Sequence, residues 1–193
     1  MPWQKSFDED QVLAKAMHVF WEKGYESASL ADLIESTGIN KGSLYNAFGG
    51  KRQLFLKALL KYDQDNRKAL IAELEALDKP REAIAQLLEK LVAETIADDD
   101  RKGCFLINTA SEIAAHEGDV VEIVTRGLKE MEAFFRRSLE VGQARGDFSK
   151  NLDPGATAKA LLGVVVAIRI LGRGVFAEPA LRTLAEEGKR LVA

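Results

Sequence analysis

The stretch from Ser29 to Tyr62 constrains the fold of this chain more than any other. It holds two short segments with helical spacing of apolar residues, separated by Gly38. Glycine tolerates the left-handed backbone that ends a helix, so the first helix is expected to stop there. Ser29 and Asn40 are suitable N-caps for the two segments. The pattern predicts a helical hairpin whose second helix runs to about Phe48.

The second helix of this hairpin is predicted to expose an unusual set of side chains. At about 100° per residue, Leu44 and Phe48 fall together and face inward. An exposed glycine costs a helix about 1 kcal/mol, which makes sense if the backbone must approach another surface closely. Exposed tyrosine and asparagine are likewise good contact groups. The residues on the outward side are Gly42, Ser43, Tyr45 and Asn46.

Positive charge is concentrated in the same part of the chain. The whole sequence has a net charge of -3, and residues 1–35 hold three basic and seven acidic residues. A basic patch on an acidic protein is the electrostatic footprint of a phosphate-binding surface. On spacing and charge alone, a DNA-binding hairpin and an ordinary solvated hairpin both remain open. Residues 36–62 hold no acid and five bases: Lys41, Lys51, Arg52, Lys57 and Lys61.

The hairpin resembles the DNA-binding region of the TetR family of transcriptional regulators. Ile34 and Thr37 stand where that family usually has alanine, and Gly49-Gly50 replaces a more usual polar pair. The resemblance covers about residues 8–62, and a pattern of this length is far more specific than a short motif. The matching positions are Ser29, Leu33, Gly38, Ile39, Asn40, Gly42, Tyr45, Phe48, Lys51 and Leu54.

The resemblance implies a helix-turn-helix DNA-binding domain at residues 1–50 and a larger helical effector-binding and dimerisation domain at residues 51–193. Asparagine can bond an adenine edge in the major groove, whereas tyrosine, serine and lysine commonly bond phosphates. We expect Tyr45 and Lys51 to anchor phosphates and Asn46 to reach a base edge. The expected DNA-binding residues are Ser29, Lys41, Gly42, Ser43, Tyr45, Asn46 and Lys51.

The fold class is predicted to be all-α. Val164–Val166 is strand-like but lies within a longer helical pattern, and Asp98–Asp100 indicates a solvated loop rather than a metal site. Helices are expected at about 8–23, 30–37, 41–48, 51–77, 80–97, 105–116, 119–144, 154–173 and 179–192.

The segment 161–171, LLGVVVAIRIL, is apolar almost all round. Such a helix must be buried on nearly every side, which is difficult in a small domain without a second copy of the protein. The family resemblance implies a homodimer in which the last two helices of each subunit form a four-helix interface. We expect Leu161, Val165 and Ile168 at this interface. A central core helix in a monomer is the alternative, because composition does not distinguish the two.

Cys104 is the single cysteine, so the chain has no internal disulfide. It lies at the start of a predicted helix and follows Arg101 and Lys102, and both features favour a reactive thiolate. Gly103, Cys104 and Glu112 are arranged similarly to TetR-type regulators that sense electrophiles or oxidants. A buried, inert cysteine is the alternative.

Catalytic and metal-binding motifs are not apparent. His18 and His116 do not cluster with cysteine at metal spacing. The N-terminus lacks a signal-peptide pattern, and no stretch approaches the roughly 18 apolar residues of a membrane span. We expect a cytoplasmic protein that is not an enzyme and uses no cofactor or metal.

The sequence therefore predicts a ligand-responsive, DNA-binding transcriptional regulator. It is expected to act as a repressor that a small-molecule or electrophile effector releases from operator DNA. The expected partners are double-stranded operator DNA, a second copy of the chain and an unknown small-molecule effector, but no membrane. The alternative is a helical small-molecule-binding protein or enzyme that uses the hairpin for protein contact.

Overall fold

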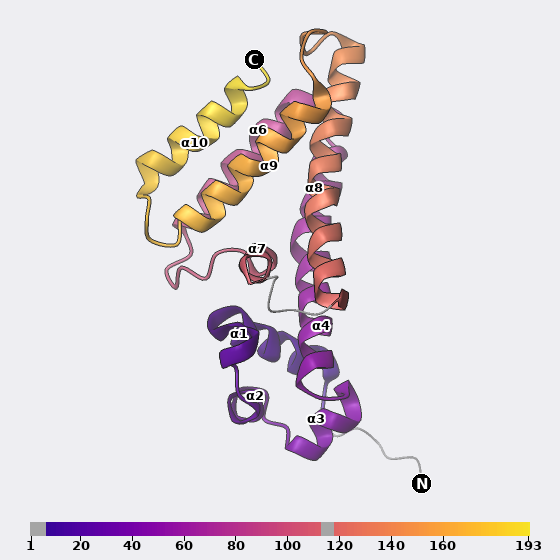
Figure 1. Cartoon of the computed structure of the whole chain (residues 1–193), viewed down its shortest axis with the longest axis vertical. Coiled ribbons are helices and arrows are strands. Elements are labelled where there is room, and N and C mark those ends of the chain that lie inside the picture. Colours follow the sequence, from indigo (N-terminus) through magenta and orange to yellow (C-terminus); the bar gives the residue numbers. More distant parts are fainter. Residues whose placement is uncertain (1–6, 113–117) are drawn as a thin grey trace.

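The computed structural model describes residues 7–112 and 118–193, and over these residues it contains helices and no strand. The all-α prediction is confirmed. In Figure 1, α1–α3 lie at one end of an elongated molecule, and α4 leads from them towards the longer helices. The helices are α1 (Glu9–Ser27), α2 (Leu30–Thr37), α3 (Lys41–Phe48), α4 (Lys51–Tyr62), the π-helical segment η1 (Asp63–Lys68), α5 (Ala69–Glu75), α6 (Pro80–Ile96), α7 (Phe105–Ser111), α8 (Gly118–Arg145), α9 (Pro154–Leu171) and α10 (Glu178–Arg190).

The hairpin of α2 and α3 forms as predicted, because local groups cap both helices. Ser29 and Asp32 form a capping box, in which the serine Oγ accepts from the Asp32 backbone N–H at 3.1 Å. The Asn40 side chain accepts from the Ser43 backbone N–H at 2.8 Å. Gly38, with a φ of 76°, ends α2 in the left-handed conformation.

Three helix boundaries differ from the predictions. Gly24, with a φ of 77°, interrupts α1 near its predicted end, but helix resumes as far as Ser27. The long helix predicted at 51–77 is present but widens into the π-helical turn η1, where Asp63 and Arg67 are buried. Helix α7 ends at Ser111, and the remainder of its predicted range, including His116, lies outside the described residues.

Buried aromatic rings join the N-terminal helices to the rest of the molecule. The Phe55 ring lies 5.1 Å from that of Phe20 and 5.7 Å from that of Phe105, measured between centroids. These residues come from α4, α1 and α7, and each is at most 2% exposed. One continuous core therefore links α1–α4 to α7 and α8, so a shift of α7 is felt by α1 and α4.

The prediction that Leu161, Val165 and Ile168 form the dimer interface was wrong. All three are at most 4% exposed within a single subunit and belong to the core that α9 shares with α6, α8 and α10. The helix is apolar on every side, so its periodicity could not show which stripe its own subunit buries. The opposite, solvent-facing stripe consists of Ala156, Ala160, Gly163, Ala167 and Ile170, of which all but the half-buried Ala167 are exposed.

Helix α9 also corrects the expectation about membrane spans. Its 18 residues have a mean hydropathy of 1.6, so length and composition alone would allow it to cross a bilayer. Only 22% of that window is buried within the subunit. Because α9 packs between α8 and α10, as the core helix of a helical domain does, its open apolar stripe is better suited to a protein partner than to lipid (Figure 1).

Candidate functional site

Helix α3 presents the predicted contact side chains on one face. Leu44 and Phe48 are at most 4% exposed and anchor the opposite face to the core. Tyr45 is 45% exposed, although it is a large aromatic residue. Lys41, Gly42 and Asn46 are also exposed, and Ser43 is half-buried. The structure therefore brings five of the seven predicted DNA-binding residues together on one helix.

The turn after α3 holds Tyr45 in place. Gly49 has a φ of 82° and Gly50 a φ of 112°, and both values disfavour any residue with a Cβ. A Cβ on Gly50 would lie 3.1 Å from Cε1 of Tyr45, so the ring packs directly over this glycine. The Lys41 amine lies 5.9 Å from the centre of the same ring. The Gly49-Gly50 departure from the family pattern thus produces a defined turn that supports the exposed tyrosine.

The other two predicted contact residues lie beside α3 and are already partly engaged. The Ser29 hydroxyl donates to Asp32 at 2.7 Å. The Lys51 amine donates to the Glu26 carbonyl at 3.3 Å and lies 4.6 Å from the centre of the Tyr25 ring. Lys51 is therefore held close to the end of α1 and is half-buried.

Two of the five bases in the basic segment are neutralised by acids from outside it. Arg52 pairs with Asp119 at the start of α8, and Lys61 pairs with Asp65 at 2.8 Å. For Lys41, Lys51 and Lys57, the described part of the chain shows no ion pair. Lys57 was not among the predicted contacts, but its amine lies 5.2 Å from the ring of Phe48 at the end of α3.

A cavity of about 480 Å³ lies in the larger helical part of the subunit. Its size falls in the range of small-molecule sites. The wall is contributed by α1, α4–α9 and η1, which explains why no local sequence signal could reveal it. Its apolar members are Trp21, Ala69, Leu70, Leu91, Leu106, Ile107, Leu128, Met131, Leu162 and Val165.

Cys104 is half-buried, lies at the N-cap of α7 and forms part of the cavity wall. Its neighbour Tyr62 is 6% exposed. Burial raises the pKa of Tyr62 well above its usual value, and the adjacent Cys104 raises it further. Tyr62 therefore stays an uncharged phenol beside the thiol. The role of Cys104 as a sensor stays a prediction.

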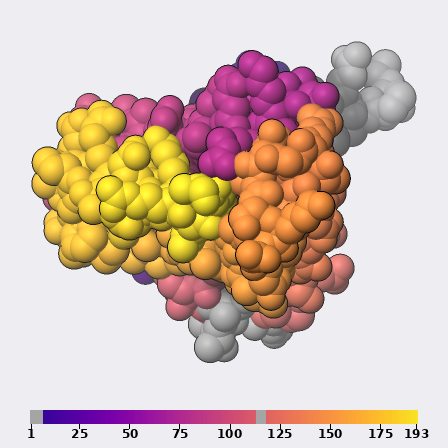
Figure 2. All heavy atoms as spheres, turned by 90° about the horizontal axis from the view of Figure 1, so that it is seen from above, coloured from indigo at the N-terminus to yellow at the C-terminus, as the bar shows by residue number. Residues whose placement is uncertain are grey.

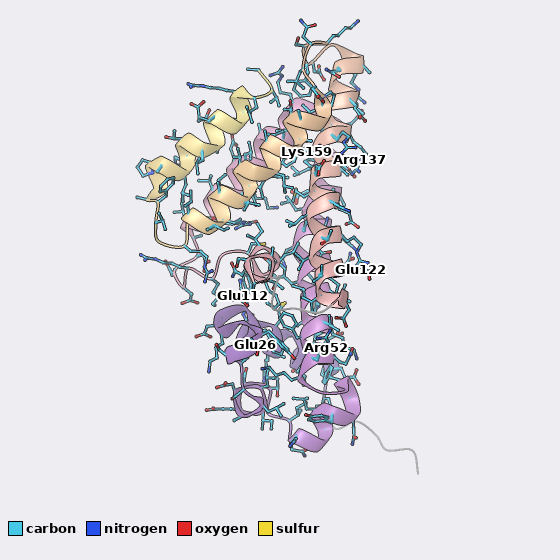
Figure 3. The ribbon with its side chains drawn as sticks, in the orientation of Figure 1. Glu26, Arg52, Glu112, Glu122, Arg137 and Lys159 are labelled. Atoms are coloured by element: carbon cyan, nitrogen blue, oxygen red, sulfur yellow. The ribbon has the colours of Figure 1, made fainter. Side chains whose placement is uncertain are left out.

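Trp21 connects the cavity to the DNA-binding end of the molecule. It belongs to α1, yet its ring lines the cavity and lies 4.9 Å from that of Tyr62. Its indole N–H donates to the Lys102 carbonyl at 3.2 Å, in the loop that carries Cys104. Figure 3 shows a second junction of α7 and α1 near Glu112. A molecule in the cavity would therefore touch α1 directly.

A buried ion-pair cluster between η1 and α8 forms the floor of the cavity. Arg67, 8% exposed, donates to both carboxylate oxygens of Asp63, at 2.6 and 2.8 Å, and to Glu130 at 2.6 Å. Burial lowers the pKa of Arg67, but the hydrogen bonds to Asp63 and Glu130 outweigh it and raise the pKa overall. Gly127 of α8 allows this close approach, since a Cβ there would lie 3.3 Å from Oδ1 of Asp63 and 3.5 Å from Nε of Arg67.

Comparisons with known proteins agree with this arrangement. Residues 12–58 match the family described as "Bacterial regulatory proteins, tetR family", and residues 76–183 match "Tetracyclin repressor-like, C-terminal domain". The HTH-type transcriptional regulator YezE of Bacillus subtilis is 35% identical over 159 residues, covering 81% of each chain. The HTH-type transcriptional repressor ComR of Escherichia coli is 32% identical over 170 residues, covering 88% of this chain and 81% of that protein.

A solved structure of similar fold is the TetR family regulator CifR, as a cysteine mutant in complex with 26-bp operator DNA. It is 30% identical, covers 99% of this chain and 100% of its own, and has a TM-score of 0.85. The two family matches, the relatives and the solved structure all indicate the same family. The chain belongs to the TetR family of ligand-responsive, DNA-binding transcriptional regulators, which act as dimers and are not enzymes.

Proposed function

We propose that a dimer of this protein represses transcription in the cytoplasm by inserting α3 of each subunit into operator DNA, and that a small molecule in the cavity releases it. The exposed face of α3 is the observation that carries this proposal: Tyr45 and Asn46 are solvent-facing on a helix whose opposite side is fully anchored. ComR is named a repressor, and CifR was solved with operator DNA. A division of the chain at residue 50 is part of the same proposal.

The second subunit is proposed to cover the open stripe of α9. A Cβ on Gly163 would meet no atom within 4 Å, and Ile170 is 42% exposed. On the adjacent α10, Leu184 is half-buried against the core, and Leu191, just after that helix, is 41% exposed. Packing two copies of α9 and α10 together would bury this surface in a four-helix interface.

Release is proposed to work through a population shift. Two recognition helices bind consecutive major grooves only when their half-sites are about 34–36 Å apart or a multiple of this distance. A ligand changes this spacing only if it binds one conformation of the dimer better than the other. Trp21 supplies the contact, since it touches the cavity, Tyr62 and the loop at Lys102.

Lys51→Ala is expected to weaken binding to all DNA sequences and to lower the slope of log affinity against log salt by about one unit. The reason is the loss of one phosphate contact near the end of α1. Fluorescence anisotropy of a labelled duplex across a salt series measures both effects. Lys150→Ala is the matched control, because this exposed lysine lies in the connection between α8 and α9. That connection is at the end of the molecule opposite α3 (Figure 1), which is the end that Figure 2 shows from above. An unchanged salt slope in Lys51→Ala would remove this residue from the interface.

Asn46→Ala is expected to relax base preference at one operator position at a cost of about 1–3 kcal/mol. The salt slope should stay as in the wild-type protein, because no phosphate contact is lost. A competition series of operators with single base-pair changes separates this effect from general weakening. Uniform loss of affinity for every operator in the series would contradict a base contact by Asn46.

Cys104→Ser is expected to resist release from operator by N-ethylmaleimide or hydrogen peroxide, both of which should release the wild-type protein. N-Ethylmaleimide adds the thiol across its double bond, whereas peroxide oxidises the thiol to a sulfenic acid and yields water. Either change enlarges a residue in the cavity wall beside Tyr62. The measurement is an operator-binding titration with and without reagent. Equal release of both proteins would show that Cys104 is an ordinary wall residue.

A further inference from the structure

All three positively charged side chains in the cavity wall are already paired with acids. Arg67 is bound by Asp63 and Glu130, as described above. Lys90 pairs with Glu73 at 3.1 Å. Among the described residues, the wall therefore offers no uncommitted cation to a ligand.

The third cation, Arg169 of α9, is mostly buried and faces α6. Its side chain is 12% exposed, pairs with Glu94 and also donates to the Thr95 hydroxyl at 3.3 Å. Glu94 lies in the last turn of α6 and Asp98 lies just after that helix, so the arginine is at an acid-rich edge of the cavity. A ligand anion would have to compete with Glu94 for the charge of this guanidinium.

Acids outnumber bases in the wall. Of the seven charged wall residues that the structure describes, four are acids: Asp65, Glu73, Glu94 and Asp98. Asp98 accepts the Gly103 backbone N–H at 2.8 Å, and within residues 7–112 and 118–193 it has no ion pair. An organic anion entering the cavity would lose hydration and meet unpaired negative charge instead of a counter-charge.

The rest of the wall suits an uncharged molecule. Aliphatic side chains and the faces of Trp21 and Tyr62 make up most of it, and the uncharged polar groups are Tyr62, Asn66 and Cys104. A cavity of about 480 Å³ accommodates a molecule of two or three fused or linked aromatic rings.

We infer that the cavity selects an uncharged, largely apolar ligand of aromatic shape and rejects organic anions of the same shape. The inference rests on the proposed function only in taking the occupant of this cavity as the effector. The selection follows from the internal pairing of Arg67, Lys90 and Arg169 rather than from the size of the cavity.

Two fluorescent probes with the same ring system test the charge selection. N-Phenyl-1-naphthylamine is uncharged, and 1-anilinonaphthalene-8-sulfonate adds a single sulfonate to the same scaffold. The wild-type dimer is expected to bind the uncharged probe at least about tenfold more tightly than the sulfonate. Equal or tighter binding of the sulfonate in the cavity would overturn the inference and leave the proposed regulatory function standing.

Glu94→Gln tests whether the pairing of Arg169 with Glu94 causes the charge selection. The substitution keeps the shape of the side chain but releases Arg169, so affinity for the sulfonate is expected to rise about tenfold while affinity for the uncharged probe changes less than threefold. Glu89→Gln is the matched control, since Glu89 lies on the same helix and pairs with Lys189 at 2.6 Å away from the cavity wall. The same gain in both variants would overturn the role of Arg169 pairing.

The site of binding is checked by energy transfer from tryptophan. The chain has two tryptophans, Trp3 and Trp21, and Trp21 lines the cavity. Transfer to the uncharged probe is expected to fall strongly in Trp21→Phe, because Trp21 lines the cavity. A loss seen only in Trp3→Phe would contradict binding in the cavity. Absence of binding by either probe to the wild-type protein would overturn both the inference and the cavity as an effector site.

Discussion

Ile170→Glu is expected to separate the two subunits and to lower operator affinity by about a thousandfold, because both half-sites are then no longer held by one molecule. Ile170 is exposed within the subunit and lies on the open stripe of α9, so a charge there would be buried, unpaired, between two copies. Analytical ultracentrifugation at micromolar protein should show a monomer, and its circular dichroism spectrum should stay helical.

Leu60→Glu is the matched control for this experiment. Leu60 is 40% exposed, almost the same as Ile170, but belongs to α4 rather than α9. Its variant is expected to remain dimeric and to bind operator. Leu161→Glu would not be informative, since Leu161 is fully buried in the subunit core and its substitution would unfold the protein. A dimer that persists in Ile170→Glu would show that the interface lies elsewhere.

Arg67→Met is expected to lower the free energy of unfolding by about 3–5 kcal/mol, because it strips the counter-charge from a buried carboxylate. Asp63 is only 2% exposed and receives two of the hydrogen bonds that Arg67 donates. Urea unfolding at one fixed protein concentration measures the change, since the stability of a dimer depends on concentration.

The double variant Asp63→Leu/Arg67→Met separates the ion pair from simple packing. Replacing both charges with apolar side chains is often neutral or stabilising, so most of the lost stability should return. A single variant that costs less than about 1 kcal/mol would mean that water or another group already satisfies Asp63. The cluster closes the contact between η1 and α8, so this measurement also reports how firmly the cavity floor is held.

Elements governed by near neighbours could be predicted from the sequence. The α2–α3 hairpin depends on Ser29, Gly38 and Asn40, and each acts on backbone groups within four residues of itself. The outward face of α3 follows from the helical period and the inward positions of Leu44 and Phe48. The length of the segments and the helical spacing of their apolar residues likewise sufficed to predict the all-α class.

Features that depend on distant partners could not be predicted. The pairing of Arg52 with Asp119 and of Arg67 with Glu130 joins residues more than 60 positions apart. The same holds for the cavity, whose wall collects side chains from α1 to α9, and for the contact of Trp21 with the Lys102 loop. No local period or motif carries this information.

Helix α9 shows the difference between what the sequence of a segment determines and what its tertiary packing determines. Its composition by itself determined that it is a helix needing burial on nearly all sides, since an apolar surface of that extent is costly in water. Only the tertiary structure decided that Leu161, Val165 and Ile168 face the subunit's own core and that Gly163 and Ile170 face outward. The physical reason is that hydrophobic burial is non-directional: the sequence determines how much surface is buried, and packing against α6, α8 and α10 selects which stripe.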